Sequence, residues 1–136
     1  MTKRAAVQVW TLPMSMILAS ACTDPTGVAR RADITLADTP APGEVSVDLL
    51  VHEQGCNSGE SAEGRIELVE LTETADQVEL QISVRPRKGT HTCLPNPPTP
   101  FTITLSRPLG DREIVDVSVV PPRPVTVDGD YLLAST

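Results

Sequence analysis

Apolar and polar residues alternate with a period of two in several runs between residues 45 and 105. The alternation is clearest in three runs, which cover residues 45–51, 78–84 and 101–105. Successive side chains of a β-strand point to opposite faces of a sheet, so this pattern predicts half-buried strands. We expect the following residues to face a shared interior: Val45, Leu80, Ile82, Ile103 and Val117.

Three further strands are predicted, and short turns separate the runs. Residues 65–72 and 113–120 are rich in aliphatic residues, although the pairs Leu68-Val69 and Ile114-Val115 break the alternation and suggest bulges or burial on both faces. Residues 124–133 are expected to add an edge strand. The pattern predicts an all-β domain, a small antiparallel β-sandwich, with an immunoglobulin-like arrangement as one option. The tryptophan and tyrosine corner typical of that arrangement are absent from the predicted domain.

The first 21 residues have the features of an export signal. Lys3 and Arg4 precede an apolar segment, residues 5–18, which polar residues and Pro13 interrupt. A membrane-spanning helix needs about 20 predominantly apolar residues, and this segment is shorter and more broken than that. We therefore predict a cleaved signal peptide over residues 1–21.

Cys22 is the predicted first residue of the exported chain. The segment Leu18-Ala19-Ser20-Ala21-Cys22 resembles the lipobox of bacterial lipoproteins, in which the cysteine is lipid-modified. The small residues Ala19 and Ala21 also satisfy the rule for ordinary secretory cleavage, and both interpretations cut before Cys22. We expect Cys22 to carry the lipid and to hold the protein at the membrane, facing the extracytoplasmic side.

The exported chain is predicted to have two parts. Residues 22–43 contain Pro25, Gly27, Pro40 and Pro42 with few large apolar side chains, which indicates a tether. Residues 44–136 then form the β-sandwich domain.

The cysteine count predicts one disulfide. If Cys22 is acylated, Cys56 and Cys93 remain, an even pair in a chain exported to an oxidising compartment. A bridge that closes a loop of this size should stabilise a small domain by about 3 to 4 kcal/mol.

Charge and aromatic content argue against several partner classes. The chain has 18 acidic and 11 basic residues, and loss of Lys3 and Arg4 with the signal leaves nine basic ones. This excess of negative charge disfavours nucleic acid and anionic lipid headgroups. Only Phe101 and Tyr131 remain as aromatic residues after cleavage, too few for the stacking platforms of single-stranded nucleic-acid or sugar sites.

The two histidines lie close in sequence to the two domain cysteines, as His52-x-x-x-Cys56 and His91-x-Cys93. Two thiolates and two imidazoles form a common zinc ligand set, but a disulfide would consume the thiolates. No catalytic motif stands out: Ser58 and Ser61 lack the context of a nucleophile elbow, and acidic residues follow no calcium-loop spacing. We expect no metal, no cofactor and no catalytic residues.

Several short segments resemble a family of small uncharacterised lipoproteins or exported proteins of actinobacteria. These segments are Val51-His52-Glu53, Cys56, Ala62-Glu63-Gly64-Arg65, Cys93, Asn96-Pro97-Pro98 and Pro108-Leu109-Gly110-Asp111-Arg112. The resemblance implies a compact exported β domain and gives no reaction or ligand. It points to His52, Glu53, Glu63 and Arg65 as candidate binding residues, to which we add His91 for its position beside Cys93.

The sequence therefore predicts a membrane-anchored surface lipoprotein, a non-enzymatic domain for display or binding. Its partner would be a protein or a small ligand, and its interaction surface would lie near the bridged loops. The alternative is a metal- or small-ligand-binding extracytoplasmic module that uses His52, His91 and nearby carboxylates.

Overall fold

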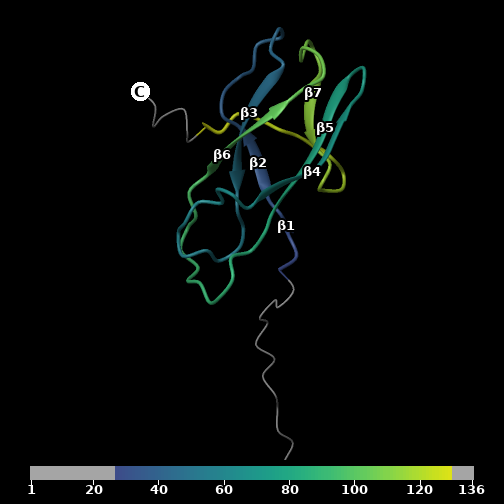
Figure 1. Ribbon diagram of the computed structural model, residues 1–136. Helices are drawn as coiled ribbons and strands as arrows, with labels where there is room; N and C mark the ends of the chain where they lie inside the picture. The colour runs from purple at the N-terminus through teal and green to yellow at the C-terminus, as the bar shows by residue number, and fades with distance from the viewer. Residues whose placement is uncertain (1–26, 130–136) are drawn as a thin grey trace, which may run out of the picture.

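The computed structural model describes residues 27–129, and the eight regular elements in this range are all β-strands (Figure 1). Their bounds are β1 Arg30–Arg31, β2 Asp33–Leu36, β3 Ser46–His52, β4 Ile66–Glu73, β5 Gln77–Val84, β6 Thr99–Thr104, β7 Glu113–Asp116 and β8 Arg123–Pro124. The predicted signal peptide and Cys22 lie outside the described residues. The all-β class predicted from the period-two pattern is confirmed.

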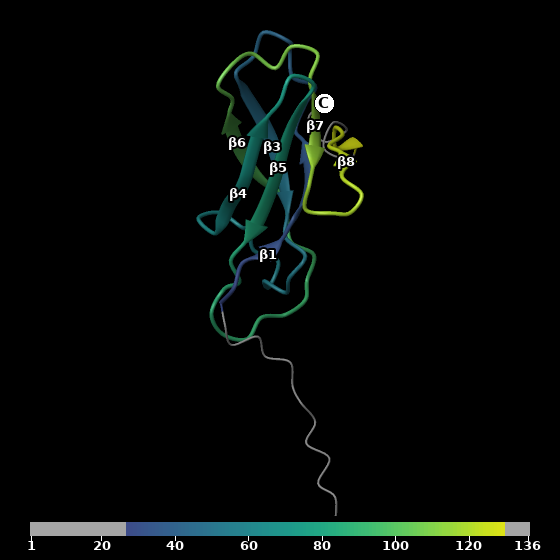
Figure 2. The same cartoon turned by 90° about the vertical axis from the view of Figure 1, so that its right-hand side faces the viewer.

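The strands form two sheets. One has the order β1-β5-β7-β8, with β4 also paired to β5, and the other has the order β2-β3-β6 (Figure 2). The β4–β5 hairpin contains a register shift between Leu68 and Glu70, where the sequence predicted a bulge. One pair departs from the antiparallel prediction, because β5 and β7 run parallel. The finer prediction of an immunoglobulin-like sandwich stays a prediction.

Aliphatic side chains from both sheets share one buried core. Leu80, Ile82 and Ile103 belong to it, as predicted. Val45 does not, because it precedes β3 and is 43% exposed, and Val117 is only partly buried just beyond the end of β7. The alternation marked β3, β5 and β6, but the strand predicted over residues 113–120 ends at Asp116, and residues 117–120 form a turn and bends. Val45 and Val117 each lie just beyond a strand end, where a period-two pattern no longer fixes the facing of a side chain.

The prediction that residues 22–43 form a tether is wrong for residues 30–36. Strand β2 pairs with β3 from Asp33↔His52 to Leu36↔Leu49, and Ile34 and Leu36 are buried in the core. Strand β1 pairs with the end of β5. The folded domain therefore begins before residue 44, because these residues supply an edge strand and part of the apolar interior.

The end of the described chain joins the two sheets. Strand β8 pairs with β7 in one sheet, and Val127 then forms a parallel bridge with Leu36 of the other. The Leu36 N–H donates to Thr126 O at 2.8 Å, and the Asp128 N–H donates to Leu36 O at 3.0 Å. Only the first part of the predicted 124–133 edge strand is described, and residues 130–133 lie outside the description. Within residues 27–129 no helix has the length and apolar character needed to cross a membrane.

Candidate binding groove

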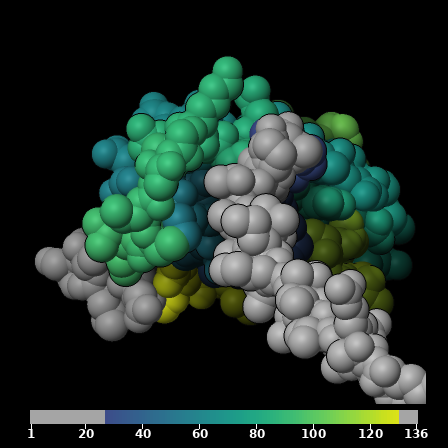
Figure 3. All heavy atoms as spheres, turned by 90° about the horizontal axis from the view of Figure 1, so that it is seen from below, coloured from purple at the N-terminus to yellow at the C-terminus, as the bar shows by residue number. Residues whose placement is uncertain are grey.

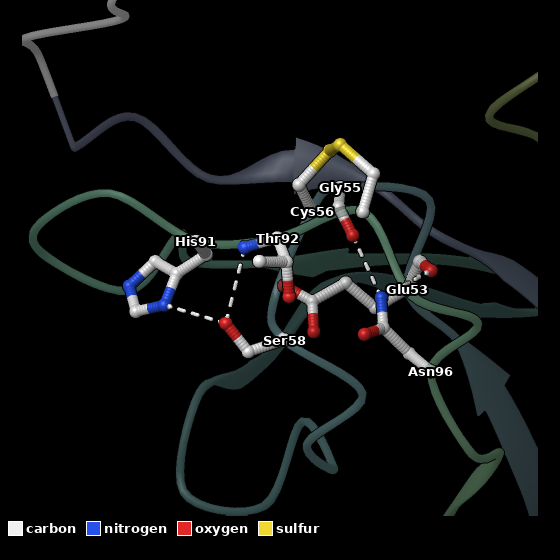
Figure 4. Close-up of a disulfide and its surroundings, with 8 residues drawn as sticks. Glu53, Gly55, Cys56, Ser58, His91, Thr92 and Asn96 are labelled. Atoms are coloured by element: carbon white, nitrogen blue, oxygen red, sulfur yellow. Dashed lines mark hydrogen bonds between the residues drawn. A yellow bond between two sulfur atoms is a disulfide. The ribbon is translucent and has the colours of Figure 1, made fainter.

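A disulfide ties together two loops at one end of the sheets. Cys56, after β3, is bonded to Cys93, before β6, which confirms the predicted bridge (Figure 4). Both cysteines are exposed. The bridge therefore braces irregular backbone rather than the buried core.

A partly buried ion pair fixes the start of the first loop. Arg65 Nη1 and Nη2 donate to Glu53 Oε1 and Oε2 at 2.7 and 2.6 Å, and the same guanidinium donates to Arg85 O and Ser61 O. A two-point arginine–carboxylate contact defines geometry as well as energy. Glu53 and Arg65, two predicted binding residues, are therefore engaged with each other and organise the loop.

Two asparagines hold the loop backbone. Asn57 is 1% exposed and donates through Nδ2 to Glu53 Oε2 and Glu60 O. Asn96 donates through Nδ2 to Glu53 O and Gly55 O, at 3.2 and 2.7 Å (Figure 4). Because buried backbone carbonyls need donors, each amide replaces a strand partner that this irregular segment lacks.

Ser58 and His91 cross-link the same loops. Ser58 Oγ lies 3.4 Å from His91 Nδ1 and accepts from the Thr92 N–H at 3.1 Å, while His91 Nε2 donates to Lys88 O at 2.9 Å (Figure 4). Ser58 has a positive φ of 56°. The serine–histidine distance exceeds the roughly 2.6 to 3.2 Å of an activated nucleophile. This contact holds the two loops in register.

A groove of about 400 Å³ opens beside the bridge. We call it the bridged-loop groove; its walls are Arg30 and Arg31 of β1, residues 53–56, Val84, and Pro86, Arg87 and residues 89–91. Figure 3 views this end from below: the green segment after β5 crosses the face on which the purple start of the described chain emerges. The groove therefore combines three separate stretches of the sequence.

Arg31 has a further partner at the edge of the groove. Its Nη1 donates to Asp33 Oδ1 at 2.8 Å, and Arg123 Nη2 donates to the same oxygen at 2.6 Å. Partial burial raises the pKa of Asp33, but hydrogen bonds from Arg123 and Arg31 outweigh it and bring the pKa below its usual value. Asp33 therefore stays ionised and orients both arginines.

The predicted binding residues do not form one cluster. Glu53 and His91 line the bridged-loop groove and Arg65 supports it, whereas Glu63 is exposed outside its lining. His52 belongs to another group: its Nε2 lies 2.9 Å from Thr35 Oγ1 and 3.4 Å from Asp128 Oδ2. His52 and His91 thus have different partners, and the described residues bring together no group of three or more metal-ligating side chains.

The sequence prediction missed the arginines of the groove. Arg30 and Arg31 lay in the predicted tether, and Arg87 lay between predicted elements. A signal of a strand was present next to Arg30 and Arg31, because the five residues that follow them alternate between apolar and polar, from Ala32 to Leu36. The prolines and glycine on either side of that short run obscured it. Arg87 carried no comparable signal.

No family model, curated protein sequence or solved structure significantly matches this chain.

Proposed function

We propose that this protein is an exported, lipid-anchored domain that acts by binding, with the bridged-loop groove as its binding site. The observation that carries the proposal is the groove itself, a hollow of about 400 Å³ whose walls a disulfide and a two-point ion pair hold in place. Binding sites are commonly concave and preformed, since a fixed wall loses little conformational entropy when a ligand binds.

The proposed location of the protein, outside the cytoplasm and anchored at the membrane, rests on two features. The first is the signal-like segment that ends in Ala19-Ser20-Ala21-Cys22. The second is the Cys56–Cys93 disulfide, since structural disulfides persist in oxidising compartments outside the cytosol. In this proposal the lipid on Cys22 anchors the protein and the domain presents its groove on the extracytoplasmic side.

The anchor is tested by replacing Cys22 with Ala and fractionating cells that produce the protein. The wild-type protein should sediment with membranes, and globomycin should block its processing. The Cys22→Ala variant should be soluble, because it would lack the acyl chains that anchor a lipoprotein. Continued membrane retention of the variant would exclude lipidation as the anchor.

The binding site is tested by placing a photo-cross-linking amino acid at Thr90, which lines the groove, and at Thr104 of β6 as a matched control. Both threonines are exposed. After irradiation of intact cells, the mass of the purified protein should show an adduct at position 90 and none at position 104. Equal labelling at the two positions, or none at position 90, would rule out the groove as the binding site.

A further inference from the structure

Basic residues surround the bridged-loop groove. Arg30, Arg31 and Arg87 form part of its walls, with His91 beside them. Among residues 27–129, Glu53 is the acidic residue in the lining, and both of its carboxylate oxygens accept hydrogen bonds from Arg65. The charge presented by the groove is therefore positive, in a protein whose overall charge is strongly negative.

Acidic residues collect at the opposite end of the sheets. Three connections meet there, since Arg107 Nη2 donates to Thr74 O and the Gly110 N–H donates to Pro42 O. These connections and their flanks carry Asp38, Glu44, Asp76 and Asp111. The two arginines at this end are engaged, Arg112 with Glu73 at 2.8 Å and Arg107 with the turn backbone. Part of the negative charge that disfavoured anionic partners thus lies away from the groove.

The remaining charges near the groove do not reverse its sign. Asp33 pairs with both Arg31 and Arg123 at the rim. Glu60 and Glu63 belong to the bridged loop but lie outside the groove lining. A concave site with one sign of charge concentrates ligands of the opposite sign, because its low-dielectric walls focus the field.

We propose that the bridged-loop groove binds the phosphate group of an anionic ligand; this rests on the proposed role of the groove as the binding site. A guanidinium presents a planar set of donors that matches the oxygens of a phosphate. Both side chains line the groove, Arg30 from β1 and Arg87 from the loop after β5, so in this proposal a bound phosphate accepts hydrogen bonds from two separate segments of the chain.

The phosphate has two sources that share this chemistry. Cys22 precedes Arg30 by eight residues, and eight extended residues span at most about 28 Å. A lipid on Cys22 would therefore keep the groove close to the membrane, within reach of phospholipid headgroups. The other source is a soluble phosphate ester that reaches the same arginines.

The test uses the exported chain with Cys22→Ser, so that acylation does not itself produce membrane binding. Inorganic phosphate is titrated into the isotope-labelled protein and followed by nuclear magnetic resonance, with chloride as the control anion. The backbone amide signals of residues 87–91 should shift. Arg30→Gln and Arg87→Gln should each weaken phosphate binding about tenfold, the loss expected for one charge-assisted hydrogen bond.

Arg107→Gln is the matched control, because Arg107 is an exposed arginine at the opposite end of the molecule. It removes the same charge and should change the affinity by less than about twofold. The two groove variants each replace an exposed side chain. If one of them fails to fold, the other still tests the proposal. No saturable shift in the wild type, or equal weakening by Arg87→Gln and Arg107→Gln, would overturn the proposal.

Vesicles separate the two sources. If lipid headgroups supply the phosphate, the Cys22→Ser protein should float with vesicles that contain phosphatidylglycerol and not with vesicles of phosphatidylcholine alone, and Arg87→Gln should abolish flotation. Phosphate binding without flotation supports a soluble ester. If the cross-linking experiment gives an adduct at position 90 but phosphate does not bind, the phosphate proposal is overturned and the groove keeps its proposed function. If no adduct forms at position 90, the proposed function itself is overturned.

Discussion

Arg65 and Glu53 form a two-point ion pair in which the side chains are only 16% and 8% exposed. The pair connects the residue before β4 to the segment after β3, and so it closes the base of the bridged loop. A second arginine–glutamate pair, Arg85 with Glu67, has a similar distance of 2.7 Å but 56% and 39% exposure. The two pairs differ in burial and also in the number of contacts, because Arg65 meets both oxygens of Glu53 and donates to two backbone carbonyls as well.

We expect Arg65→Ala to lower the free energy of unfolding by about 3 to 5 kcal/mol, because it leaves the Glu53 carboxylate buried without its counter-charge. Arg85→Ala should cost at most about 1 kcal/mol, as for other solvent-exposed pairs. Urea unfolding of the two variants measures both values. Similar losses at the two positions would contradict the prediction that the Glu53–Arg65 pair stabilises the fold more than an exposed pair does.

Replacing Cys56 and Cys93 together with Ala should lower the free energy of unfolding by about 2 to 5 kcal/mol, since the bridge restricts the unfolded chain. The cysteines are 37 positions apart, and the bridge lies outside the buried core. The reduced wild-type protein should therefore match the double variant in urea unfolding and keep a strand-rich circular dichroism spectrum. A double variant as stable as the oxidised protein would contradict the prediction.

The start of the folded domain can be tested by truncation. A chain that begins at Gly27 should unfold cooperatively, whereas one that begins at Glu44 should fail to fold, because it lacks β2 and the buried side chains of Ile34 and Leu36. Loss of a large buried aliphatic side chain costs about 2 to 5 kcal/mol, and two such losses approach the whole stability of a small domain. Thermal unfolding followed by circular dichroism distinguishes the fragments. A cooperative transition in the shorter one would restore the tether prediction.

Acid should destabilise the protein in part through Glu73. The Ser106 N–H and the Arg112 guanidinium hydrogen bond to its carboxylate at 2.6 and 2.8 Å and lower its pKa from 4.5 to about 2. A folded-state pKa below the unfolded value gives stability that is present above pH 4.5 and is lost as the pH falls towards 2. Glu73→Gln should remove this part of the pH dependence.

Unfolding free energies measured between pH 2 and 6 provide the comparison for Glu73. Glu70→Gln is the control, since Glu70 is exposed on the same strand and accepts a hydrogen bond from Thr72. It should keep the acid dependence of the wild type. An unchanged pH dependence in Glu73→Gln would show that other groups account for the acid effect.

The sequence by itself determined three strands of the core, β3, β5 and β6, and the disulfide. Leu80, Ile82 and Ile103 belong to period-two runs. In such a run the apolar side chains all point to one face of the sheet, and that face is the buried one. The pairing of Cys56 with Cys93 followed from the cysteine count once Cys22 was assigned to the lipid. Both are local or countable properties, and neither depends on how the strands are ordered.

Only the tertiary structure decided where the groove lies and which charges it presents. Arg30, Arg87 and Cys56 come from three distant stretches that the pairing of β1 with β5 and the disulfide bring together. The short run from Ala32 to Leu36 gains its strand pairing from β3, a partner that no local pattern specifies. Net charge is likewise a sum over the chain, whereas a binding site responds to the charges nearest to it, and their positions are set by the fold.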